Sequence, residues 1–350
     1  MKYLSHHASG GVSVLRVGLS LSLLFLAASV SAAEPAEEFR GELHDFGYKI
    51  VHEAYQDGNW ELLICNADGS QSTNLTQSPD VNELYPHVSP DGKKICFVVD
   101  EGTGPTQTRS VFVMNIDGTG RKLVAKNARQ ACWKSDSSAI AYLKSESDKF
   151  SFLDYATKGI VVYDLQTGKH EEHMNKELHH LYNLCWSPDA KWFLATVHAG
   201  MGVSHAILAI EAQGTRVVNL NIPGCRPDIS SDGTKVVWGP SDWALRIGTL
   251  DYSGPEPKVV DARDVVTSEK PMKVYHADLS PCGKYMTFSR GPVIKRLGPV
   301  SEIVGIKAQG WNICVADTMT TNRWVPITTE GQSYKEPDWV PADGATENAP

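Results

Sequence analysis

The chain has 350 residues, with 33 Lys and Arg against 41 Asp and Glu, and its formal charge is −8 at pH 7. An acidic chain is a poor partner for nucleic acid or for an anionic membrane surface, so binding to either is not expected. Its seven cysteines include no CxxC pair, which argues against a zinc site and leaves the pairing of the thiols open.

Residues 1–33 are predicted to be a secretory signal peptide. Lys2 and Arg16 supply its positive charge, and the apolar stretch 17–30 is too short to cross a bilayer as a membrane anchor. The small residues that follow predict cleavage after Ala32 or Ala33. The mature chain is therefore expected to be periplasmic or secreted, without membrane insertion, and monomeric.

The rest of the chain divides into a short linker at 34–43, one domain at 44–342 and a disordered tail at 343–350. The domain begins with three predicted strands, at Lys49–Ala54, Trp60–Asn66 and Thr73–Thr76. Alternating apolar residues between Gly, Asp and Asn punctuation indicate these strands.

A repeated unit then follows, in which a short strand ends in a Ser-Pro-Asp-Gly turn or a degraded copy of it. The six copies begin at Tyr85, Ala131, Leu184, Pro227, Ala277 and Pro337. Their spacing of roughly 43 to 60 residues is typical of propeller blades. Second strands follow the turns at Lys94–Val99, Ala139–Leu143, Trp192–Val197, Lys235–Trp238 and Lys284–Ser289. A third and a fourth strand complete each unit.

The two ends of the domain complement each other. The first unit lacks an inner strand, whereas the last unit has a surplus one at Glu336–Val340, after its fourth strand at Trp324–Thr328. Pairing the surplus strand with the first unit removes the open edges. The predicted fold is therefore an all-β, six-bladed propeller of four-stranded antiparallel blades, closed by the C-terminal strand on the N-terminal blade.

Several segments resemble repeats of the TolB-type β-propeller family. They are Leu-Leu-Ile-Cys-Asn-Ala-Asp-Gly-Ser at 62–70, Asn-Leu-Thr at 74–76 and His-Val-Ser-Pro-Asp-Gly-Lys-Lys-Ile-Cys-Phe at 87–97. The resemblance covers 44–342 and implies the propeller fold. Few residues separate the predicted signal peptide from the first strand, so the N-terminal domain that precedes the propeller in TolB is expected to be absent.

The loops predict which face of the propeller is the working surface. Two classes of turn are short and uniform, and alternating strand directions place both on one face. Asp91, Asp136, Asp189 and Asp232 belong to these turns, where a carboxylate caps backbone N–H groups. The long, unlike loops fall on the other face, at 100–109, 144–158, 171–181, 197–204, 262–274 and 290–310. Variable loops on a rigid scaffold are where binding specificity usually lies.

Aligned inner strands place two rings of residues along the channel. The first ring is Tyr85, Gln130, Asn183, Arg226, His276 and Glu336, and the second is His87, Cys132, Cys185, Asp228, Asp278 and Asp338. Residues two apart on a strand share one side. A ligand site is therefore predicted at one channel mouth, on the long-loop face, from Arg226, Asp228, His276, Asp278, Glu336, Asp338, Tyr85 and His87.

Three interpretations of this cluster remain open. It is a structural polar plug, or a site for Ca²⁺ or another divalent cation, or a site for a polar ligand such as a sugar acid or a peptide terminus. The metal ligands would come from Asp228, His276, Asp278 and Asp338. A second metal site is less favoured, at His179, His180, His198 and His205.

The sequence favours a non-enzymatic scaffold that binds a protein or a polar small molecule or carbohydrate. The alternative is a carbohydrate- or lactone-active lyase or hydrolase that uses a metal at the channel mouth. A serine peptidase of the propeller-bearing kind is excluded, because the chain has no GxSxG elbow.

Overall fold

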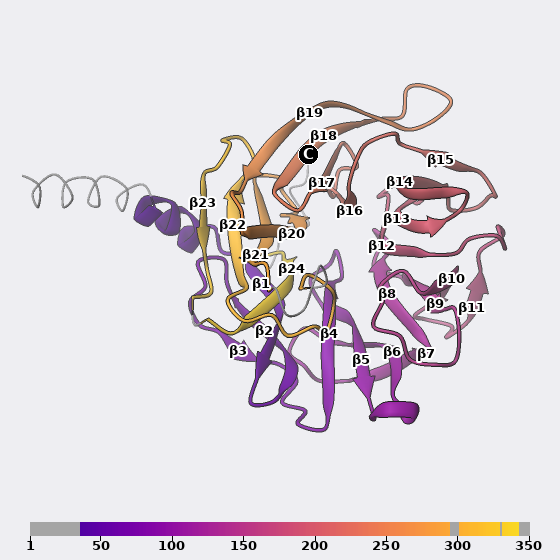
Figure 1. The fold of residues 1–350 in the computed structure, drawn as a ribbon, viewed down its shortest axis with the longest axis horizontal. Helices are drawn as coiled ribbons and strands as arrows, with labels where there is room; N and C mark the ends of the chain where they lie inside the picture. Colours follow the sequence, from indigo (N-terminus) through magenta and orange to yellow (C-terminus); the bar gives the residue numbers. More distant parts are fainter. Residues whose placement is uncertain (1–35, 295–300, 330, 343–350) are drawn as a thin grey trace, which may run out of the picture.

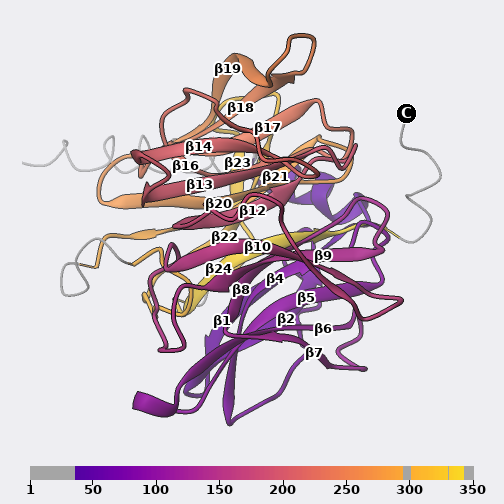
Figure 2. The same cartoon turned by 90° about the vertical axis from the view of Figure 1, so that its right-hand side faces the viewer.

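The computed structural model describes residues 36–294, 301–329 and 331–342. Six four-stranded sheets are arranged around a central axis (Figure 1), and Figure 2 shows them from the side. The predicted signal peptide, the first residues of the predicted linker and the predicted tail lie outside the described residues. Among the residues described, no helix has the length and apolar character needed to span a bilayer.

The blades follow one another along the chain, with the first strand of each nearest the axis. Blade 1 contains β24 (Ser333–Val340), β1 (Lys49–Gln56), β2 (Asn59–Asn66) and β3 (Thr73–Asn74). Blade 2 contains β4 (Val81–Val88), β5 (Lys94–Glu101), β6 (Thr108–Asn115) and β7 (Lys122–Lys126), with a short 3₁₀ helix, η1 (Gly104–Thr106), before β6. Blade 3 contains β8 (Ala128–Trp133), β9 (Ala139–Ser145), β10 (Thr157–Asp164) and β11 (His170–Glu172).

The second half of the ring has the same organisation. Blade 4 contains β12 (Leu181–Trp186), β13 (Trp192–Gly200), β14 (Val203–Glu211) and β15 (Val217–Asn219). Blade 5 contains β16 (Cys225–Ile229), β17 (Lys235–Ser241), β18 (Ala244–Asp251) and β19 (Lys258–Thr267). Blade 6 contains β20 (Met272–Leu279), β21 (Tyr285–Pro292), β22 (Asn312–Asp317) and β23 (Trp324–Pro326).

The ring is closed by the strand predicted to close it. β24 pairs antiparallel with β1, and Ile50 is the partner of Trp339 in this register. In Figure 1 the yellow β24 accordingly lies beside β1, which is indigo. The predicted six-bladed, all-β fold and its closure are confirmed.

Apolar side chains fill the spaces between neighbouring blades. One such cluster contains Leu194 and Ile207 from blade 4 together with Val236 and Trp238 from blade 5, all of them buried. The short turns add polar contacts, since Asp91 accepts hydrogen bonds from Ser89 Oγ and from the backbone N–H of Lys93. The predicted structural role of the turn aspartates is consistent with this network.

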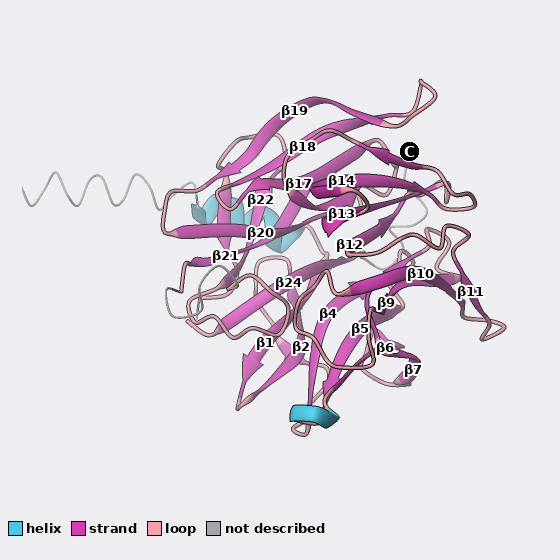
Figure 3. Cartoon of the chain, turned by 45° about the vertical axis from the view of Figure 1, so that its right-hand side comes forward, coloured by secondary structure: helices cyan, strands magenta, loops and turns pink. Residues whose placement is uncertain are grey.

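The expectation of a linker is wrong for residues 36–43, because residues 36–45 form a helix (Figure 3). Phe39 and Leu43, four residues apart on one helical face, are each only 1% exposed. They pack in one cluster with Tyr285 of blade 6 and Trp339 of blade 1. Burial of this apolar face is the physical reason that the segment is ordered.

Candidate functional site

Every inner strand carries the same backbone irregularity at its first-ring residue. Tyr85, Gln130, Asn183, Arg226, His276 and Glu336 all have positive φ angles, between 47° and 58°. The pairing register shifts at these positions in all six blades, which marks six equivalent β-bulges. The six residues that the sequence aligns as the first ring therefore occupy structurally equivalent positions in the six blades.

The first-ring bulges also connect neighbouring blades. The backbone N–H of Tyr85 donates to Glu53 Oε2 of blade 1 at 3.1 Å. The N–H of Arg226 donates to Thr196 Oγ1 of blade 4 at 2.8 Å. The N–H of Asn183 donates in the same way to Gln130 Oε1 of blade 3 at 3.1 Å. At these three bulges a side chain of the preceding blade thus accepts a hydrogen bond from the backbone.

The charged members of the first ring form a buried network, which we call the upper tier. Arg226 Nη1 lies 3.1 Å from Glu336 Oε1, and Arg226 Nη2 lies 2.7 Å from Asp154 Oδ2. His276 Nε2 lies 3.0 Å from the same Glu336 oxygen. Arg226, His276, Glu336 and Asp154 are all at most 6% exposed. Sequence reasoning missed Asp154, which comes from the β9–β10 loop and carries no signal of its own.

The electrostatics of the upper tier favour a permanently ionised pair. Burial acts to raise the pKa of Glu336, but the charges of His276 and Arg226 overcome it and hold this pKa at about 2. Burial acts to lower the pKa of Arg226, and Glu336 and Asp154 reverse this effect so that the pKa is raised. Buried ion pairs of this kind are what the polar-plug interpretation expects, and for the upper tier that interpretation stays a prediction.

Four residues of the second ring form a separate group, which we call the lower tier. It consists of the acids Asp228, Asp278 and Asp338 together with His87. Asp338 Oδ2 accepts from the N–H of Val88 at 3.0 Å and lies 2.9 Å from His87 Nδ1. Asp228 Oδ2 accepts from the N–H of Leu279 at 3.0 Å. Each of these two carboxylates therefore reaches the backbone of the next blade.

Crowding raises the proton affinity of the lower tier. Burial, with the charges of Asp338 and Asp228, raises the pKa of Asp278 well above its ordinary value. Burial acts to lower the pKa of His87, but the neighbouring Asp338 raises it overall. Crowded carboxylates hold protons more tightly because a positive charge among them relieves their mutual repulsion, and a bound cation would relieve it in the same way.

The expectation of a single opening on the long-loop face is wrong, because the two tiers lie at different depths. Residues two apart on a strand are separated by about 6.6 Å along its axis. A cavity of about 30 Å³ lies between the tiers, and its lining includes Tyr85, Arg226 and Asp278. The lower tier instead opens on the short-turn face, into a cavity of about 230 Å³ that Pro90 and Pro281 of the short turns also line.

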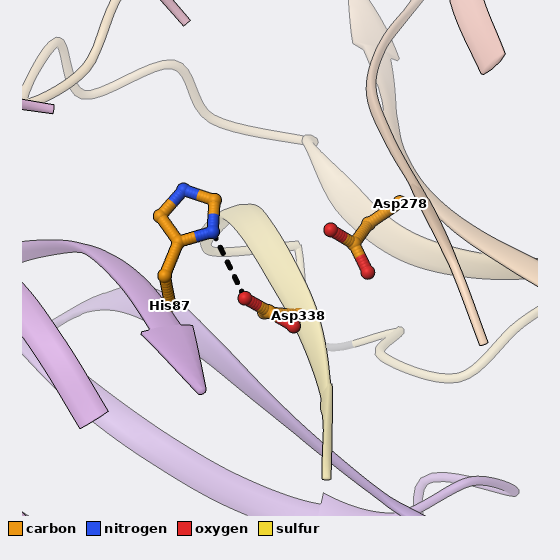
Figure 4. A group of neighbouring side chains, drawn as sticks. All are labelled: His87, Asp278 and Asp338. Carbon is orange, nitrogen blue, oxygen red and sulfur yellow. Dashed lines mark ion pairs between the residues drawn. The ribbon is translucent and has the colours of Figure 1, made fainter. Parts of the chain in front are cut away.

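The lower tier has the spacing of a possible metal centre. His87, Asp278 and Asp338 each offer one ligand atom, and these atoms lie within 4.8 Å of one another (Figure 4). The predicted ligand His276 lies in the upper tier, so His87 replaces it. No group containing His179, His180, His198 or His205 has such spacing among the described residues. A divalent cation at this position stays a prediction.

A further cavity of about 320 Å³ opens on the long-loop face. Its walls include Tyr155, Tyr182, His198 and His205 from blades 3 and 4. The Tyr182 hydroxyl lies 3.0 Å from His205 Nε2, and the rings of Tyr155 and His198 have centroids 4.5 Å apart. Of these residues, sequence reasoning singled out only the two histidines, and it considered them as metal ligands.

The Asp228→Asn variant is expected to gain stability relative to the parent as pH rises. Burial raises the pKa of Asp228 to about 7, whereas an aspartate in an unfolded chain titrates near about 3.9. Between these values the folded protein binds the extra proton, so the free energy of unfolding falls as pH rises. Asparagine removes this titration and keeps an acceptor for Leu279.

The measurement is urea unfolding of parent and variant at about pH 5 and about pH 8. We expect the difference in unfolding free energy, variant minus parent, to be larger at the higher pH. An equal difference at both pH values would contradict the raised pKa.

No family model matches the chain. A TolB homologue from Chlorobaculum tepidum is 32% identical over 126 residues, which is 35% of this chain and 27% of that protein. The match therefore spans less than a third of the relative's length.

Two solved structures have a similar fold over 85% of this chain, each with a TM-score of 0.58. TolB from Acinetobacter baumannii is 19% identical, with 67% of its chain covered. A chain of a nidogen/laminin complex is 9% identical, with 99% covered. At these identities the likeness concerns the fold. The protein is a six-bladed β-propeller with TolB-like repeats.

Proposed function

We propose that the protein is an exported, monomeric, non-enzymatic scaffold that binds another protein through its long-loop face. The observation that carries the proposal is the 320 Å³ cavity on this face, with its tyrosine and histidine walls. Aromatic side chains are enriched in protein interfaces because they bury a large area at a small entropic cost. Phe152 lies in a long loop of the same face and is 46% exposed.

The comparisons give this proposal its support at the level of the fold. The chain has TolB-like repeats, and one structure of similar fold comes from a complex between two proteins, nidogen and laminin. Propellers host many unrelated functions, so the argument rests on the surface of this chain.

The chemistry of the channel favours the scaffold over the alternative carbohydrate- or lactone-active enzyme. Arg226 would have to hold a polar substrate in that enzyme, yet it already forms ion pairs with Glu336 and Asp154. His276 likewise lies within hydrogen-bond distance of Glu336 and of Ser289 Oγ. A substrate would need to break these buried pairs, each at considerable cost.

Photocrosslinking tests the proposed surface. A benzoylphenylalanine residue is placed at Phe152 or, as the control, at Met319 in the β22–β23 turn of the opposite face, which is 77% exposed. We expect a discrete crosslinked species from Phe152 and none from Met319. Equal crosslinking from Met319, or no product from Phe152, would refute the proposal.

Export is tested separately on protein produced with its first 33 residues. Intact-mass measurement of the exported fraction is expected to give a chain that begins near Glu34. Exported protein that retains Met1 would be inconsistent with a cleaved signal peptide.

A further inference from the structure

The cavity on the short-turn face is a funnel with apolar walls and an acidic floor. Its walls include Trp133, Trp186 and Trp339, which occupy equivalent positions in three blades, and four turn prolines, Pro90, Pro188, Pro281 and Pro341. Its floor is the lower tier. The funnel is on the opposite side of the propeller from the surface proposed to bind a protein partner.

The charge of the funnel selects for a cation. Its lining residues include three carboxylates, those of Asp228, Asp278 and Asp338, no lysine or arginine, and one imidazole, that of His87, which is paired with Asp338. An anionic ligand would be repelled, and a neutral ligand would leave the mutual repulsion of the floor unchanged. A positive charge placed at the floor would relieve this repulsion.

Hydrogen bonds fix two of the three indole rings. Trp133 Nε1 donates to the carbonyl oxygen of His87 at 2.7 Å, and Trp339 Nε1 donates to that of Asp278 at 3.2 Å. Each bond ties the ring to the inner strand of the preceding blade, so this part of the wall is held in place before a ligand enters.

We propose that the funnel binds the side chain of an arginine or lysine residue that belongs to another polypeptide. The cationic group lies at the carboxylates of Asp228 and Asp278. The apolar stem of the side chain packs against the indole rings, which also attract the cation through their faces.

The walls are the reason to prefer a basic side chain over a metal ion. A divalent ion would use only the floor, where His87, Asp278 and Asp338 offer three ligand atoms. It would leave the three indole rings without a role. A basic residue of a peptide uses the floor and the walls together.

The test is isothermal titration of the full chain with small probes in the presence of EDTA. The probes are the Nα-acetyl methylamides of arginine and lysine, and the matched neutral control is the same derivative of citrulline. We expect both basic probes to bind and the citrulline derivative to bind at least roughly tenfold more weakly. Equal binding of citrulline would overturn the role of charge.

Two variants locate the site. Asp278→Asn is expected to weaken the arginine derivative roughly tenfold. The control Glu256→Gln removes one exposed negative charge in the β18–β19 hairpin of the same face and is expected to have no effect. Equal losses in both variants would mean a general surface effect, and no loss in Asp278→Asn would overturn the site.

A third variant serves if Asp278→Asn does not fold. Asp228→Asn removes another carboxylate of the floor and keeps an acceptor for Leu279, so it should also weaken the arginine derivative roughly tenfold. An unchanged affinity in this variant would overturn the site.

Titration with Ca²⁺ and Mn²⁺ in the absence of EDTA tests whether the funnel binds a metal ion instead of a basic side chain. If either metal ion binds and neither basic probe does, at concentrations up to about 10 mM, the funnel is a metal site and the proposal is wrong. If no probe binds, the proposal is wrong as well. Neither result bears on the crosslinking experiment at the opposite face.

Discussion

Truncation after Gln332 is expected to abolish the cooperative folding of the propeller. The deletion removes β24, all eight residues of which are buried, from the inner position of blade 1. It leaves β1 without its partner and opens the ring between blades 6 and 1. It also removes Trp339 from the cluster that holds the helix of residues 36–45. The unpaired edge of β1 would then promote aggregation.

The measurement is thermal unfolding followed by circular dichroism. The matched control is truncation after Ala342, which removes only residues 343–350 and is expected to leave the melting transition unchanged. A protein truncated after Gln332 that melts cooperatively at the temperature of the parent would show that ring closure contributes little.

The Arg226→Met variant is expected to lose about 3–5 kcal/mol of unfolding free energy. Methionine fills a similar volume but leaves the carboxylates of Glu336 and Asp154 buried without their counter-charge. Breaking one side of a buried ion pair is costly because the remaining charge has lost its hydration and gained no partner. Solvent screening is weak here, since Arg226 is only 5% exposed.

The control for this variant is a solvent-exposed pair with the same residue types. Arg246 Nε lies 2.7 Å from Asp264 Oδ1, but the two side chains are 38% and 37% exposed. Arg246→Met is therefore expected to cost only about 0–1 kcal/mol. Urea unfolding of both variants at neutral pH measures the difference. Similar losses in the two would show that the upper tier is not a structural plug.

A second substitution checks the cause of the effect. The double variant Arg226→Met/Glu336→Gln removes the counter-charge together with one of the stranded carboxylates. Its unfolding free energy is expected to exceed that of Arg226→Met alone. A further loss in the double variant would point to packing around Arg226 as the cause.

The sequence by itself determined the repeat and the equivalence of positions within it. Each Ser-Pro-Asp-Gly-like turn marks the end of an inner strand, and the surplus strand at 336–340 identified the closing partner of the first blade. The two rings were aligned correctly, as the positive φ at all six first-ring residues shows. Local patterns suffice for this because turn chemistry and strand alternation act over a few neighbouring residues.

The tertiary structure alone decided how the aligned residues are grouped. Arg226 and Glu336 are joined by Asp154, whose loop sequence gives no indication that it folds over the channel. Asp228 and Asp278 lie two residues further along their strands and face the opposite opening, so they contribute to a different site. Helix 36–45 likewise depends on apolar surface that blades 1 and 6 expose only once they are assembled. Burial, ion pairing and access to solvent arise from segments far apart in sequence, and no local pattern specifies them.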